Sequence, residues 1–138
     1  MKQKPIIDCH LIPIYDIPFI FTAYTSKLDD IIPTVKKFTK QVDRPWIANK
    51  LPDIREAFDG GYGSSYGLYS NKGSYAALLQ LSNDVFKDKE LPCVLPHEVA
   101  HIVTRICDYC GIPENLNTTE PRAYLTGYLN AYCHKLLK

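Results

Sequence analysis

The chain has 138 residues, of which 46% are hydrophobic and 22% charged, as is usual for one compact globular domain. Its 16 Lys and Arg residues nearly balance 15 Asp and Glu residues, so no overall charge favours nucleic acid or an anionic membrane. A chain of this length buries enough surface to fold without a disulfide or a structural metal ion. We therefore expect a single domain over residues 1–138, in which any metal site is functional.

The cysteines and the N-terminus favour a cytoplasmic protein. The 5 cysteines are scattered and odd in number, unlike the disulfide framework of a small secreted protein. Charged residues and prolines interrupt the apolar stretch after Lys2 and Lys4, so it does not resemble a signal peptide. No run approaches the roughly 20 apolar residues of a membrane span.

The first part of the chain predicts two strands and a helix. Residues 6–25 are rich in β-branched and aromatic side chains, and residues 16–18 mark a turn between two strands of a hairpin. Ser26 resembles the first residue of a capping box, and apolar residues then recur at helical spacing over about residues 27–41. A connection with a short helix starting at Pro52 follows.

The middle of the chain predicts a second hairpin, and the last third predicts two helices. Residues 64–70 and 74–81 are strand-like, and a turn that ends in Gly73 separates them. In the first helix Pro96 suits the first turn, while Gly111 and Pro113 follow its end. The second helix has Thr118 or Thr119 as its N-cap and extends to about Leu137. This order of elements predicts an α+β fold with a small mixed sheet.

The strongest functional signal lies in the first of these two helices. Residues 97–101 read His-Glu-Val-Ala-His, and two histidines four residues apart project from the same face of a helix. They can therefore bind one metal ion, and Glu98 beside His97 is a candidate general base. The alternative is that His97 and His101 are partly buried histidines and that Glu98 is solvated.

A catalytic zinc ion needs a third protein ligand, and Glu120 is the candidate. It follows His101 after 18 residues and opens the next helix, so a neighbouring helix could present it to the same ion. Tyr124, one turn later, could donate a hydrogen bond to a developing oxyanion or orient Glu120. Alternatively, Glu120 is a first-turn carboxylate that the helix dipole favours, and Tyr124 packs in the core.

These residues resemble a known family. The segment 97–101, followed by Thr-Glu-Pro-Arg-Ala-Tyr-Leu at residues 119–125, is similar to the gluzincins, the zincin metallopeptidases with a glutamate as third zinc ligand. It is more similar still to short metallopeptidase-like proteins encoded by phages and prophages. The resemblance is specific over about residues 91–129 and concerns only the architecture upstream.

The resemblance implies a minimal zincin-like fold and a zinc-dependent peptidase that cleaves a peptide or protein substrate. His97, His101 and Glu120 would bind zinc, and Glu98 would activate the attacking water. The sheet would precede the metal helix, and residues 76–81 would form its edge strand, where an extended peptide can pair. Larger gluzincins carry a further helical domain that forms the other wall of the cleft. The alternative is therefore a phage or prophage zinc protein that is not catalytic, or a protease whose cleft is completed by a second copy of the chain or by a partner protein.

The remaining cysteines and His10 receive other interpretations. Cys107 and Cys110, with Cys133 and His134, could in principle form a zinc site, but we expect these cysteines to pack as small buried side chains. His10 lies on the first predicted strand, where we expect a surface or core-filling histidine rather than a metal ligand.

Overall fold

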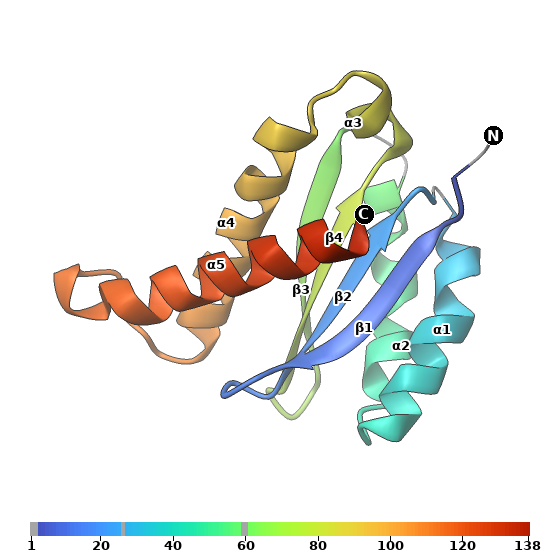
Figure 1. Cartoon of the computed structure of the whole chain (residues 1–138). Helices are drawn as coiled ribbons and strands as arrows, with labels where there is room; N and C mark the ends of the chain where they lie inside the picture. The colour runs from blue at the N-terminus through green and yellow to red at the C-terminus, as the bar shows by residue number, and fades with distance from the viewer. Residues whose placement is uncertain (1–2, 26, 59–60) are drawn as a thin grey trace.

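A computed structural model describes residues 3–25, 27–58 and 61–138 of the chain (Figure 1). Its centre is a four-stranded sheet with the strand order β1-β2-β4-β3. β1 and β2 are antiparallel, β2 and β4 are parallel, and β3 and β4 are antiparallel. The strands are β1 (Ile6–Ile12), β2 (Ile17–Ala23), β3 (Gly63–Tyr69) and β4 (Tyr75–Leu81).

Helices cover both faces of the sheet, which confirms the predicted α+β class (Figure 1). One face is covered by α1 (Leu28–Gln41), α2 (Trp46–Lys50) and the 3₁₀ helix η1 (Leu51–Phe58). The short helix α3 (Asn83–Lys87) leads from β4 into α4 (Leu91–Tyr109). A 3₁₀ turn, η2 (Leu116–Thr118), precedes α5 (Thr119–Leu136), and α4 and α5 cover the other face.

Two hydrophobic clusters lie on either side of the sheet because successive strand residues point to opposite faces. Phe19, Phe21 and Leu79 are fully buried beneath α4 and α5. Ile20 and Leu78 are fully buried against α1 and α2. The central strands β2 and β4 are thus buried on both faces, as the near-continuous apolar character of their sequences requires.

The edge strand beside α4 is β3, so the expectation that residues 76–81 form that edge is wrong. Those residues belong to β4, which pairs with β2 on one side and β3 on the other and is buried along its whole length. Apolar side chains on both faces of β4 stabilise it inside the sheet. The predicted hairpin itself is confirmed as β3–β4, with its turn at Gly73.

Some element boundaries differ from the predictions. The first turn lies at residues 13–16, because Ile14 and Asp16 take positive φ and Asp16 N–H bonds to Ile12 O at 2.9 Å. Pro18 therefore lies in β2, where pairing with β4 begins only at the next residue. Ser26, the predicted capping residue, lies outside the described residues, and Lys27 is the N-cap of α1.

Helix α4 begins earlier than predicted, and Pro96 lies inside it rather than in its first turn. Pro92 takes the first-turn position instead. Leu95 is fully buried, and Leu91 and Val94 pack on the same core. The burial of these apolar side chains stabilises the additional N-terminal turns, although Pro96 cannot donate a backbone hydrogen bond within the helix. Of the two predicted N-caps of α5, Thr118 is the one that the structure has.

Gly67 on β3 leaves room for the ring of Tyr75, which a side chain at this position would have to displace. A Cβ atom there would lie 2.7 Å from Cε2 of the Tyr75 ring, so we expect Gly67→Ala to lower the free energy of unfolding by about 1–3 kcal/mol. Gly127→Ala is the control, because nothing lies within 4 Å of that position and alanine stabilises a helix by about 0.5–1 kcal/mol relative to glycine. Urea unfolding of both variants measures the contrast, and a Gly67→Ala variant as stable as the wild type would contradict it.

Candidate active site

His97 and His101 form a close pair on the exposed face of α4. Their Nε2 atoms lie 3.1 Å apart and their ring centroids 4.7 Å apart. Two nitrogen ligands of a tetrahedral zinc ion, each bound at about 2.0–2.1 Å, lie about 3.3 Å from each other. The pair therefore fits two of the four ligand positions of zinc.

Glu98 lies on the flank of α4 that faces the start of β3. Only 8% of it is exposed, which is low for a carboxylate. A Cβ atom at Gly63 would lie 3.2 Å from Cγ of Glu98 and 3.1 Å from Val94, so glycine lets the strand and the helix approach here. Glu98 and His97 both border a surface pocket of about 280 Å³, which is lined by Tyr62, Gly63, Glu90, Cys93, Val94, His97 and Glu98.

Glu120 and Tyr124 lie on exposed parts of α5. Tyr124 is 41% exposed, and its ring stacks on Tyr128 with centroids 6.0 Å apart. Within residues 3–25, 27–58 and 61–138, no three His, Cys, Asp or Glu side chains gather closely enough to hold a metal ion. The structure thus brings His97 and His101 together and places Glu98 in a pocket that His97 borders, but it does not gather Glu120 with the two histidines.

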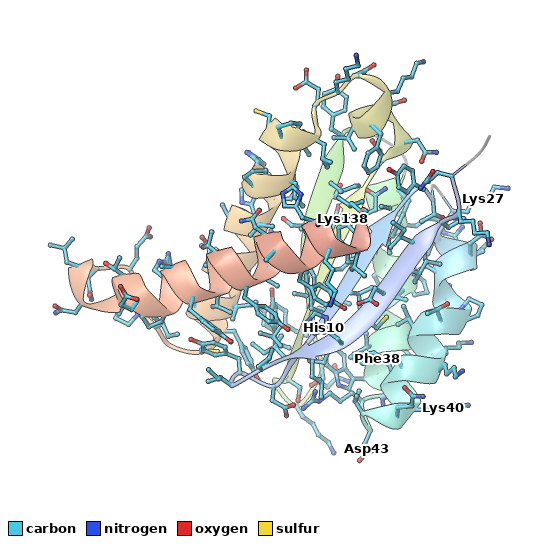
Figure 2. The ribbon with its side chains drawn as sticks, viewed as in Figure 1. His10, Lys27, Phe38, Lys40, Asp43 and Lys138 are labelled. Carbon is cyan, nitrogen blue, oxygen red and sulfur yellow. The ribbon has the colours of Figure 1, made fainter. Side chains whose placement is uncertain are left out.

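Two polar contacts between α5 and β1 help to explain the position of α5. The Tyr132 hydroxyl donates a hydrogen bond to the Asp8 carboxylate. The His10 Nε2 atom lies 3.0 Å from the Tyr128 hydroxyl, and the His10 ring lies 3.8 Å from that of Tyr132. These contacts attach the C-terminal half of α5 to the sheet, while its first turns project past α4 (Figures 1 and 2).

His10 therefore joins a strand to a helix, which the sequence interpretation as a surface or core-filling residue did not anticipate. Its Nδ1 atom is buried without a hydrogen-bond partner and lies 3.9 Å from the Asp8 carboxylate. Burial lowers the pKa of His10, and the negative charge of Asp8 opposes that shift only in part. The neutral form of His10 is therefore the one that the folded protein favours.

This shift predicts a loss of stability in acid. In the unfolded chain this histidine has a pKa of about 6.5 and binds a proton more readily than folded His10 does. His10 therefore contributes to the free energy of unfolding above pH 6.5, and this contribution decreases as the pH falls below 6.5. We expect the free energy of unfolding to fall less between pH 7.5 and 5.5 in His10→Gln than in the wild type. His134→Gln, at an exposed position of α5, is the control and should fall like the wild type. Equal falls in all three proteins would contradict the assignment.

Two cysteines pack between α4 and α5 as predicted. Cys107 and Cys133 are fully buried in the same hydrophobic cluster. The expectation that Cys110 is buried is wrong, because it is the C-cap of α4 and is exposed. Burial raises the pKa of the Cys133 thiol to about 12, so this side chain stays protonated and apolar near neutral pH.

Sequence reasoning did not single out three residues near this site. Tyr62 and Gly63 border the pocket from the β3 side, and Arg105 follows Glu98 on α4 by seven residues. Seven residues make nearly two helical turns, so the helical spacing alone could have identified Arg105. Tyr62 and Gly63 carry no comparable signal, because their proximity to α4 depends on the sheet order.

None of the described helices combines the length and the apolar character needed to cross a bilayer. Comparisons of the chain with protein-family models, curated proteins and solved structures gave no match.

Proposed function

We propose that the chain is a zinc-dependent peptidase that hydrolyses peptide bonds at the exposed face of α4. The observation that carries the proposal is the 3.1 Å separation of the His97 and His101 Nε2 atoms, and Glu98 lines a pocket that His97 also borders. His97, His101 and Glu120 are the proposed zinc ligands. Glu98 is the proposed general base.

The chemistry divides between the metal ion and the chain. When bound, zinc acts as a Lewis acid and lowers the pKa of a water molecule to about 7. Glu98 takes a proton from the attacking water on a carboxylate oxygen and returns it to the leaving amine nitrogen. Because Glu98 is largely buried and lines the pocket that His97 also borders, its carboxylate has few orientations available.

Tyr124 and Glu120 have proposed roles that require the first turns of α5 to reach the histidines. Tyr124 would donate a hydrogen bond to the oxyanion of the tetrahedral intermediate, or it would orient Glu120. Both side chains are exposed, but Leu125 in the same part of α5 is fully buried, so such an approach has to keep or replace its core packing.

Strand β3 is the proposed binding surface for the substrate backbone. It is an edge strand, and its start lies against Val94 and Glu98 of α4. An extended peptide can add to such an edge through main-chain hydrogen bonds. A peptide bound there would place one of its carbonyl groups next to Glu98.

Zinc stoichiometry and peptide cleavage test the proposal together. The wild-type protein, purified without chelators, should hold about one zinc ion per chain and cleave a mixed peptide library. His97→Ala and His101→Ala should each lose most of the zinc, and Glu120→Ala should bind it more weakly than the wild type. His134→Ala is the matched control and should keep both properties. A wild-type protein without stoichiometric zinc would refute the proposal.

The second candidate function is a zinc protein that is not catalytic, or one whose cleft is completed by a partner. The resemblance suggests a phage or prophage protein as the example. This second candidate is favoured by the absence of a third ligand beside His97 and His101 among the described residues. Under this alternative, zinc affinity is unchanged in Glu120→Ala, and zinc binding is not accompanied by turnover. Light scattering with and without zinc would then show whether a second copy supplies the missing ligand.

A further inference from the structure

Helix α4 and the edge strand β3 run side by side for the whole length of the strand. At one end, Val94 and Glu98 approach Gly63. At the other end, Tyr109 of α4 stacks on Tyr75 at 5.2 Å, and Tyr75 is opposite the last residue of β3 in the register. The helix spans about 22 Å between these ends and the strand about 20 Å, so positions along one correspond to positions along the other.

Arg105 lies between these two ends. It follows Glu98 by nearly two helical turns, which places it on the same flank of α4, and it is exposed. Burial raises the pKa of the Tyr75 hydroxyl and the positive charge of Arg105 opposes that rise, which is consistent with a guanidinium near Tyr75. Glu98 lies at Gly63, the start of β3, and seven helical residues rise about 10 Å, so the position of Arg105 along α4 corresponds to the middle of the edge strand.

The charge of Arg105 is not neutralised by an ion pair. None of the ion pairs in residues 3–25, 27–58 and 61–138 includes it. Strand β3 contains no charged residue. Asp108, three residues further along α4, is exposed and its negative charge also acts on Tyr75, but it forms no ion pair with Arg105. A cation next to an uncharged strand edge is a recognition feature for an anionic group on whatever pairs with that edge.

We infer that Arg105 selects an acidic side chain in a peptide bound along β3, about three residues from the bond that lies beside Glu98. The separation follows from the geometry, because seven helical residues rise about 10 Å and an extended peptide covers that distance in about three residues. This inference rests on the proposed function in taking the ligand to be a peptide. To the proposed function it adds the class of substrate, a peptide with an acidic side chain, and the residue that recognises that side chain, Arg105.

The test compares acidic and neutral peptides on matched variants. The peptides are otherwise identical and carry Asp or Asn either at the third residue before the cleaved bond or at the third residue after it. Wild-type protein should cleave one of the Asp peptides about five- to tenfold faster than its Asn counterpart, and Arg105→Gln should remove that preference. Arg55→Gln, an exposed arginine of η1 on the other face of the sheet, should keep it. A preference that survives in Arg105→Gln, or equal cleavage of all peptides by the wild type, would overturn the inference.

A binding measurement separates this inference from the proposed function. Fluorescence anisotropy of the same labelled peptides on Glu98→Gln, with and without Arg105→Gln, reports recognition without cleavage. If the wild type cleaves no peptide but the Asp peptide still binds more tightly through Arg105, the proposed function fails and the recognition stands. If cleavage occurs without any dependence on Arg105, the function stands and the inference fails.

Discussion

Replacement of Glu98 by Gln should lower the rate of peptide hydrolysis by about 10²–10⁴-fold. Glutamine has nearly the shape of glutamate, but its amide cannot take the proton of the attacking water. Because Glu98 is not among the proposed zinc ligands, the variant should retain zinc. Single-turnover cleavage of a fluorogenic peptide, with zinc measured on the same sample, separates loss of the base from loss of the metal.

Glu90→Gln is the matched control for that experiment. Glu90 borders the same pocket as Glu98, but it is exposed at the start of α4 and lies two turns from Glu98. Its replacement should change the rate by less than about threefold, because a solvated carboxylate this far from the histidines does not reach the attacking water. Equal losses in the two variants would show that the pocket needs negative charge rather than a general base.

The largest effect on stability should come from Phe21→Ala. Phe21 is fully buried between the sheet and the helices α4 and α5, so its truncation leaves a cavity beneath the helix that carries His97. Substitutions of this kind lower the free energy of unfolding by about 3–5 kcal/mol. Urea unfolding followed by circular dichroism measures the change.

Phe38→Ala provides the comparison, since Phe38 of α1 is only half-buried and belongs to neither hydrophobic cluster (Figure 2). Its loss should be near 1 kcal/mol, as for a partly exposed aromatic side chain. If both variants lost the same stability, the core beneath α4 would have to be packed more loosely than the burial of Phe21 indicates.

Local patterns in the sequence predicted the elements that depend on neighbouring residues. The β3–β4 hairpin follows from strand-like runs around a turn with glycine, and Thr118, one of the two predicted N-caps, is the N-cap of α5. The pairing of His97 with His101 follows from helical periodicity, which is a property of one segment. These features need no knowledge of the rest of the chain.

Features that depend on distant segments were not predicted. The edge position of β3 is set by the parallel pairing of β2 with β4, whose residues are separated by more than 50 positions in the chain. The position of α5 relative to α4 depends on contacts with β1, including that of Tyr128 with His10. Spacing along the chain could propose Glu120 as a ligand, but it could not determine where those contacts place it.

The contact between Tyr132 and Asp8 joins residues 124 positions apart in the chain. Contacts of such long range are slow to form, because the chain must close a large loop before they stabilise it. During synthesis, the helix with His97 and His101 leaves the ribosome before α5 can pack on β1. Packing of the last helix is therefore a late event, and until then the apolar surface around Phe19 on the α5 side of the sheet lacks its final cover.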